Sequence, residues 1–127
     1  MITQHPGSSA VYAGGAVTYS NELKKSVLGV QSATLNTFGA VSEQTVKEMA
    51  QGAILKFKTD YAVAVSGIAG PDGGTTEKPV GTVWIAVADK TGVTAKVFSF
   101  GNKRVQNIER SAIAALTMVL QELKTVS

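Results

Sequence analysis

Cysteine is absent from the sequence and histidine occurs once, as His5, so several kinds of chemistry are excluded at the outset. Without cysteine the chain can form neither a disulfide nor a thiolate nucleophile, and this composition is compatible with a cytoplasmic protein. A single histidine near the start cannot provide a zinc site by itself or complete a Ser-His-Asp triad. We therefore expect no metal site.

A strong charge of one sign and long apolar runs are also missing. The net charge is +3 and the basic residues are scattered, with Lys24-Lys25 and Lys103-Arg104 as the only basic pairs. Nucleic acid is therefore not expected as a partner, whereas a small anionic ligand would suit the mild positive charge. Because no apolar run approaches the thickness of a bilayer, and the first residues do not resemble a signal peptide, no membrane association is expected.

What the sequence does contain is the patterning of one globular domain over residues 1–127, with 44% hydrophobic and 17% charged residues. Periodicity and capping residues predict four strands, over 10–19, 61–65, 80–87 and 93–100, and four helices, over 22–28, 33–38, 43–58 and 104–124. A helix that leads into a buried strand is typical of an α/β fold. We expect a three-layer α/β/α sandwich with a mixed sheet.

Helix ends and helix faces are the clearest local signals. Ser20 or Asn21 can cap the first helix, Gly29 can end it, and Ser42 can cap the third helix. In the closing helix the helical spacing of apolar residues predicts a buried stripe of Ile108, Ala112, Ala115, Leu116, Val119 and Leu123. We expect this helix to pack on the sheet through that stripe.

The longest break in the hydrophobic pattern is the glycine-rich segment 66–76, which separates two predicted core strands. Its glycines allow backbone N–H groups to approach a ligand closely and to form a concavity that binds an anion. Long ordered loops of this kind are often functional. The alternative is a simple hairpin connection in which Pro71-Asp72-Gly73-Gly74 only makes the turn. A known phosphate-binding loop is not indicated, because a strand rather than a helix follows.

A second candidate lies where the first predicted strand meets the first helix, at Tyr19-Ser20-Asn21-Glu22-Leu23-Lys24. Lys24 follows Ser20 by about one helical turn, and a partly desolvated lysine beside a hydroxyl can act as a general base or stabilise charge. Tyr19 could donate a hydrogen bond to a developing oxyanion. In the alternative interpretation, Ser20 and Asn21 only cap the helix and Lys24 is solvated.

Several longer motifs resemble those of a known family. They are Pro6-Gly-Ser-Ser9, Gly14-Gly15, Thr18-Tyr-Ser-Asn21 with Lys24, Leu28-Gly-Val30, Gly39-Ala-Val-Ser-Glu43, Ser66-Gly-Ile-Ala-Gly-Pro-Asp-Gly-Gly74 and Glu77-Lys-Pro-Val-Gly-Thr-Val-Trp84. In this order, and over nearly the whole chain, they resemble the CinA C-terminal domain family of competence/damage-inducible proteins.

The resemblance implies a nicotinamide mononucleotide amidohydrolase, which produces nicotinate mononucleotide and ammonia in the bacterial cytoplasm without a cofactor. It implies catalytic roles for Tyr19 and Lys24. The implied substrate is a pyridine mononucleotide, and the implied substrate-binding residues are Ser20, Asn21, Ser66, Gly67, Ile68, Ala69, Gly70, Gly73, Gly74 and Arg104. Arg104 would contact the phosphate, and a homo-oligomer is implied as well.

One part of the family pattern has no match in this sequence. The family carries a Glu-Ser-Cys-Thr-Gly-Gly motif on a preceding strand and helix, and its serine is taken to be the nucleophile. We therefore expect a family domain shortened at its N-terminus, with an exposed sheet edge where that strand would lie. Three hypotheses stay open: an amidohydrolase domain, a non-catalytic nucleotide-binding or oligomerisation module, and an association with nucleic acid linked to competence.

Overall fold

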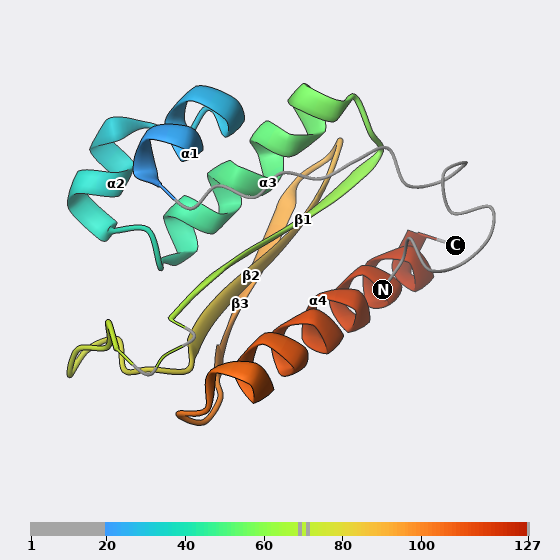
Figure 1. Cartoon of the computed structure of the whole chain (residues 1–127). Helices are drawn as coiled ribbons and strands as arrows, with labels where there is room; N and C mark the ends of the chain where they lie inside the picture. The colour runs from blue at the N-terminus through green and yellow to red at the C-terminus, as the bar shows by residue number, and fades with distance from the viewer. Residues whose placement is uncertain (1–19, 69, 71, 127) are drawn as a thin grey trace.

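A computed structural model describes residues 20–68, 70 and 72–126 of the chain (Figure 1). In chain order its elements are α1 (Asn21–Leu28), α2 (Ser32–Phe38), α3 (Glu43–Phe57), β1 (Tyr61–Gly67), β2 (Thr82–Asp89), β3 (Val93–Ser99) and α4 (Arg104–Val126). These elements confirm the helices and strands predicted from residue 20 onward, with ends that agree to within about two residues. The strand predicted over 10–19 lies outside the described residues.

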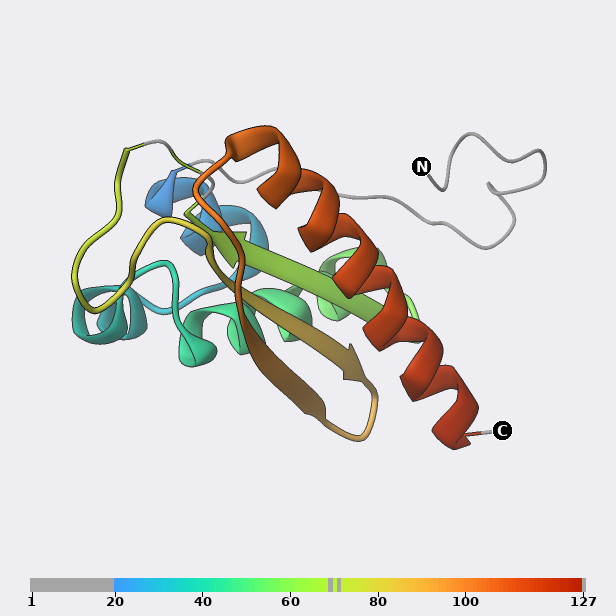
Figure 2. The same ribbon diagram turned by 90° about the horizontal axis from the view of Figure 1, so that it is seen from below.

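The three described strands form an antiparallel sheet in the order β1-β2-β3, with Val63 opposite Val87 and Ala86 opposite Ala95. Helices α1, α2 and α3 lie on one side of this sheet and α4 lies on the other (Figures 1 and 2). The α/β class and the three-layer arrangement are therefore confirmed. The mixed sheet is not found among these strands, because no helix lies between consecutive strands to carry the chain back into a parallel pair.

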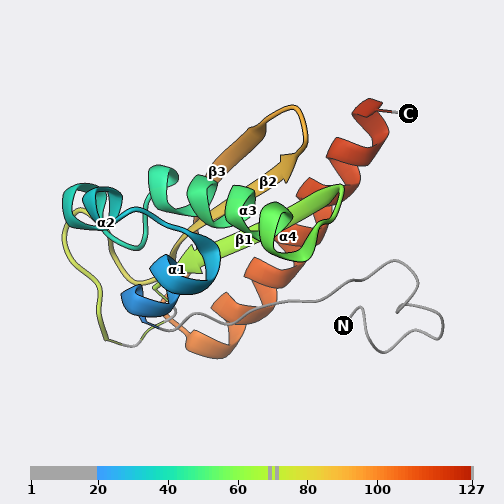
Figure 3. The same cartoon turned by 90° about the horizontal axis from the view of Figure 1, so that it is seen from above.

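Side chains alternate along the strands and so build two apolar cores, one on each face of the sheet. On one face, alanines of β1 and β2 pack against α3, which lies over the strands when viewed from above (Figure 3). This core includes Val46, Met49, Ala50, Ala64, Ala86 and Ala88. On the other face, larger side chains of β2 pack against α4, in a core that contains Val83, Ile85, Val87, Ala115 and Met118.

The predicted caps are present at the helix ends that lead to the candidate site. Ser20 Oγ accepts a hydrogen bond from the Leu23 N–H at 3.1 Å, which confirms Ser20 as the N-cap of α1. Ser42 caps α3 in the same way, and Gly29, with φ of 73°, ends α1 in the left-handed conformation. These local contacts fix where α1 and α3 begin.

Helix α4 packs on the sheet as predicted, with Ala115 and Val119 of the predicted stripe against the core, but the buried face is not the whole predicted stripe. Asn107 is only 1% exposed and Met118 is buried, whereas the predicted stripe residues Ile108 and Leu123 are exposed. Ala115 is buried as predicted. The Asn107 Nδ2 donates a hydrogen bond to the Gly101 carbonyl at 2.8 Å, which satisfies one polar group of this buried amide. No helix in the described part of the chain is long and apolar enough to span a membrane.

Candidate functional site

The two ends of the glycine-rich loop, here called its neck, are hydrogen-bonded to each other where the loop joins β1 and β2. The Ile68 N–H donates to the Thr82 carbonyl at 2.9 Å, and the Gly81 N–H donates to the Ile68 carbonyl at 2.7 Å. Gly81 also accepts a hydrogen bond from the Phe100 N–H at 2.9 Å. The two ends of the loop are therefore held together, next to the connection between β3 and α4.

Lys78 ties the far part of this loop to helix α2. Its Nζ donates to the carbonyl of Phe38, the last residue of α2, at 2.6 Å. The carbonyl end of a helix carries partial negative charge, so a lysine ammonium is favourable there. The Thr75 N–H donates to the Lys78 carbonyl at 2.9 Å, and this bond closes the turn that places Lys78.

The connection between α2 and α3 anchors the start of the loop. The Ser66 hydroxyl, at the end of β1, donates to the Ala40 carbonyl at 2.8 Å. The preceding carbonyl, of Gly39, accepts hydrogen bonds from the Ser42 and Thr45 hydroxyls at 2.9 and 2.6 Å. The motif Gly39-Ala-Val-Ser-Glu43 is thus held by its own hydrogen bonds and in turn fixes the last residues of β1.

Arg104, the first residue of α4, reaches the loop from the opposite layer. Its Nη1 donates to the Gly70 carbonyl at 3.0 Å, across a sequence separation of 34 residues. The structure therefore brings together Arg104 and the glycine-rich loop, which the family resemblance had placed in one ligand site. The remaining N–H groups of a guanidinium can still donate to a phosphate.

Three of the loop glycines are explained by packing within the protein. A Cβ at Gly70 would lie 2.5 Å from Val80 Cγ1, and one at Gly74 would lie 2.6 Å from the Val80 nitrogen. A Cβ at Gly67 would similarly lie 2.8 Å from a side-chain atom of Val83. Gly73 differs, because a Cβ there would meet nothing closer than 3.7 Å, although its φ is positive, at +96°, like that of Gly70. Close packing accounts for glycine at these three positions without any ligand.

Lys24 is buried in α1, with 7% of its surface exposed, and the interpretation of Lys24 as a solvated residue is therefore wrong. Burial lowers the pKa of its ammonium from the usual 10.5, because desolvation disfavours the charged form. Ser20, four residues earlier, is committed to the helix cap, and Asn21 is exposed. Such a lysine releases its proton more readily than a solvated one and can then act as a neutral base.

The described contacts thus join the predicted residues in two groups. Ser66, Gly70 and Arg104 belong to the loop and its anchors, whereas Ser20, Asn21 and Lys24 belong to α1. Tyr19 and Ala69 lie outside the described residues. Lys78 was missed, although it lies in the quoted Glu77-Lys-Pro motif, because nothing local indicates that its ammonium reaches a helix end forty residues away.

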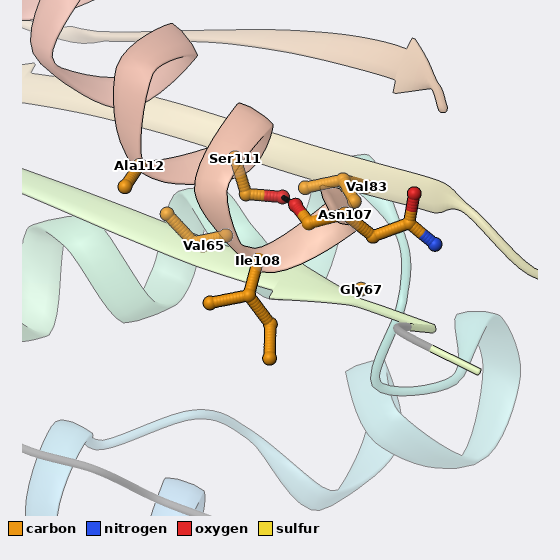
Figure 4. Close-up of a pocket in the computed structure, with 7 residues that line it drawn as sticks. All are labelled: Val65, Gly67, Val83, Asn107, Ile108, Ser111 and Ala112. Atoms are coloured by element: carbon orange, nitrogen blue, oxygen red, sulfur yellow. Dashed lines mark hydrogen bonds between the residues drawn. The ribbon is translucent and has the colours of Figure 1, made fainter. Parts of the chain in front are cut away.

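An open hollow of about 320 Å³ lies between β1 and the first turns of α4 (Figure 4). It is lined by Val65, Gly67, Val83, Asn107, Ile108, Ser111 and Ala112. Most of these side chains are apolar, and of the predicted site residues that the structure describes, only Gly67 lines the hollow. This surface is therefore suited to apolar contact rather than to a phosphate.

The lowered pKa of Lys24 predicts a pH-dependent stability. Because the pKa is lower in the folded protein than in the unfolded chain, the unfolded state binds more protons between those two values. The destabilisation caused by burying the ammonium is complete below the folded-state pKa and disappears as the pH rises toward 10.5. The free energy of unfolding of the wild type, relative to Lys24→Met, should therefore increase with pH in urea denaturation.

A suitable control for this measurement is Leu23→Met, which changes an exposed neighbour in α1 that carries no titratable group. Its difference from the wild type should stay constant over the same pH range. A constant difference for Lys24→Met as well would show that burial does not perturb the ammonium.

The fold and the candidate site define an α/β sandwich protein with an anchored glycine-rich loop and a buried lysine. In the sequence the lysine precedes the α2–α3 connection and the loop follows it. The family model described as CinA C-terminal domain matches residues 1–123. The chain therefore belongs to the CinA C-terminal domain family, which confirms the resemblance stated above.

Relatives and solved structures agree with this assignment. The chain is 47% identical over 126 residues to a CinA-like protein of Cytophaga hutchinsonii, covering 99% of this chain and 30% of the relative. A crystal structure of the competence/damage inducible protein CihA from Agrobacterium tumefaciens is 45% identical, with a TM-score of 0.91 over 94% of this chain and 73% of that one. A CinA superfamily protein from Escherichia coli is 32% identical, with a TM-score of 0.90, covering 94% of this chain and 70% of that one. The chain spans about 30% of the length of the curated relatives it matches.

Proposed function

We propose that this chain is a nicotinamide mononucleotide amidohydrolase domain, which binds the nucleotide at the glycine-rich loop and takes part in hydrolysing its carboxamide. The observation that carries the proposal is the buried Lys24, because the family resemblance assigns a catalytic role to this residue. Burial lowers the pKa of Lys24 and so increases the fraction of neutral amine that can act as a base.

Hydrolysis of a carboxamide needs a nucleophile at the carbonyl carbon, a donor for the oxyanion and a proton for the departing ammonia. In this proposal the neutral amine of Lys24 accepts the proton of the nucleophile as the tetrahedral intermediate forms. The resulting ammonium then returns the proton to the leaving nitrogen as the C–N bond breaks. Tyr19 is the proposed oxyanion donor.

The phosphate of the nucleotide is proposed to bind beside Arg104. Among the described contacts, Arg104 uses one guanidinium donor, Nη1, for the Gly70 carbonyl, and the residue is exposed at the start of α4. Charge-assisted, paired hydrogen bonds to phosphate are a typical use of arginine. The anchors of the loop, Lys78 and Ser66, would keep this end of the site preorganised.

A nucleotide-binding module without hydrolysis is the second candidate, and a separate observation favours it. Ser20 Oγ accepts the Leu23 N–H, and the Ser66 hydroxyl donates to the Ala40 carbonyl. Both serines of the predicted site are therefore engaged in structural hydrogen bonds, and neither is set up as a nucleophile.

The two candidates separate when nicotinamide mononucleotide and nicotinamide riboside are titrated calorimetrically into the 127-residue chain and ammonia release is measured. We expect the mononucleotide to bind at least about tenfold more tightly than the riboside, because the riboside lacks the phosphate. Arg104→Gln should weaken binding of the mononucleotide by about tenfold and leave binding of the riboside unchanged. Lys24→Ala should abolish ammonia release while the mononucleotide still binds.

Each outcome has one meaning. Ammonia release that depends on Lys24 supports the amidohydrolase. Mononucleotide binding without ammonia release supports the non-catalytic module. Equal binding of mononucleotide and riboside, or binding of neither, would contradict both candidates, and an equal effect of Arg104→Gln on the two ligands would place the phosphate elsewhere.

A further inference from the structure

We infer that Glu48 is a positioning residue for the glycine-rich loop, and that it acts on the loop through helix α2 and Lys78. This inference goes beyond the proposed function: it concerns how the loop is ordered, and it does not depend on which ligand binds there. It is carried by the contacts at the two ends of α2, which come from distant segments of the chain.

Helix α2 is a short element that provides few stabilising contacts of its own. Its seven residues (SATLNTF) carry no charge, and within the described part of the chain its N-cap residue, Gln31, makes no side-chain cap hydrogen bond. The buried residues of α2 are Thr34 and Leu35, and Leu35 joins the core that α3 forms with the sheet. Because helices this short are unstable in isolation, contacts from other segments must fix the direction of α2.

Glu48, from the middle of α3, caps the start of α2. One of its carboxylate oxygens accepts the Gln31 N–H at 2.8 Å, and the other accepts the hydroxyl of the buried Thr34. The first bond is the one that a capping-box glutamate makes, but here the glutamate comes from another helix. A carboxylate is also favourable at this end of a helix, where the macrodipole is positive. The half-buried Glu48 thus fixes the first turn of α2 against α3.

The opposite end of α2 is held by Lys78, whose ammonium donates to the Phe38 carbonyl at the negative end of the helix. Gly39, the next residue, leaves room for this contact, because a Cβ there would lie 3.2 Å from Lys78 Nζ. In Figures 2 and 3 the loop that leads into β2 passes beside α2. The uncharged helix therefore has a carboxylate at its positive end and an ammonium at its negative end, both supplied by other segments.

The Gly39 carbonyl fixes one point of α2, because it accepts hydrogen bonds from two hydroxyls at the start of α3. One fixed point leaves the direction of a helix undetermined, whereas a second one at Gln31 determines it. With Glu48 bonded there, the Phe38 carbonyl is held where it receives the Lys78 ammonium. The order of the loop around Lys78 should therefore depend on Glu48.

Amide hydrogen exchange of the 127-residue chain tests the inference without a ligand. The probes are the Thr75 N–H, which donates to the Lys78 carbonyl, and the Lys78 N–H, which donates to the Thr75 hydroxyl at 3.0 Å. Glu48→Gln removes the charge and should speed the exchange of both amides by about tenfold. The neck amides of Ile68 and Gly81 should keep their wild-type rates, whereas a general loss of stability would speed them as well.

A double-mutant comparison shows whether the effect passes through Lys78. Lys78→Met should by itself speed exchange of the Thr75 amide, and adding Glu48→Gln should then have no further effect, because the loop is already released from α2. If Glu48→Gln does not fold, Thr34→Val makes the same comparison. It removes one of the two bonds to Glu48, so we expect a smaller increase of about threefold.

Glu43→Gln is the matched control, because Glu43 lies on the same helix but pairs with Lys47, at 3.0 Å. It should leave exchange of the Thr75 and Lys78 amides unchanged. The inference would be overturned if Glu48→Gln left these amides as slow as in the wild type or sped the neck amides equally. Additive effects of the Glu48 and Lys78 substitutions would overturn it too, because Glu48 would then act on the loop by another route.

Discussion

Gly52→Ala is expected to destabilise the protein by about 3 kcal/mol or to prevent folding. In an ordinary helix interior this substitution is favourable, because alanine has the higher helix propensity by about 1 kcal/mol. Gly52 lies within α3, but a Cβ there would stand 1.7 Å from the carbonyl oxygen and 2.7 Å from the carbonyl carbon of Leu28, the last residue of α1. Backbone atoms cannot rotate away as a side chain can, so α1 would have to move.

Urea denaturation of Gly52→Ala measures this effect, with Gly92→Ala as the control. Gly92 has no positive φ, and the space that a Cβ would occupy there is open, so its substitution should be nearly neutral. A Gly52→Ala protein as stable as the wild type would mean that α1 and α3 separate without cost, and that their close contact does not hold the fold.

The contact at Gly52 bears on the burial of Lys24 as well. Leu28 is buried in the core that α3 forms with the sheet, and Lys24 lies one turn earlier on the same short helix. The absence of a side chain at Gly52 lets α1 approach α3 closely, and we expect this approach to contribute to the burial of Lys24 on the same helix. In Gly52→Ala variants that still fold, the pH-dependent difference assigned to Lys24 should therefore become smaller, because the ammonium would be better solvated.

The parts of the fold that were predictable from the sequence are those fixed by short-range interactions. Ser20 and Ser42 cap helices by contacts only three residues along the chain, and Gly29 ends α1 through its own backbone conformation. These signals placed α1 and α3 almost to the residue. Glycine is an unfavourable residue in a helix interior, but the pattern around Gly52 could not identify Leu28 as the reason for it.

The anchors of the candidate site were less predictable, because each joins distant segments. Lys78 reaches the end of α2 across 40 residues and Arg104 reaches Gly70 across 34, and neither contact leaves a periodic signal. Arg104 and the glycine-rich loop were assigned to one site only because of the family resemblance. Contacts of this kind depend on how the layers pack, which the local pattern of hydrophobic residues does not specify.

Helix α4 shows why a correct periodicity can still misplace the limits of the buried face. Its apolar residues span a wide sector, and the sheet covers only the flank that includes Ala115 and Met118. Asn107 lies on that buried flank, where its amide is bonded to the Gly101 carbonyl. Ile108, one position further, faces the hollow beside β1. The apolar sector of α4 is therefore wider than the surface that the described sheet covers.

Gly81→Ala should disrupt the neck of the glycine-rich loop and the start of α4 together. Gly81 has φ of +92°, and a Cβ there would lie 2.4 Å from the carbonyl oxygens of both Phe100 and Gly101. Conformational strain and this clash act in the same direction, so we expect a loss of about 3 kcal/mol in the free energy of unfolding. Displacing the β3–α4 connection would also pull Arg104 away from Gly70.

A series of three glycines separates the two causes. Gly92→Ala has neither strain nor a clash, and Gly73→Ala has strain alone, because its φ is +96° but the nearest atom would lie 3.7 Å away. We expect almost no loss for Gly92→Ala, about 1 kcal/mol for Gly73→Ala and the largest loss for Gly81→Ala in urea denaturation. If Gly81→Ala loses no more than Gly73→Ala, the Phe100–Gly101 connection must yield without cost, and Gly81 would then not couple the loop to α4. Faster exchange of the Ile68 and Phe100 amides in Gly81→Ala alone would show that the coupling acts through the hydrogen bonds of the neck.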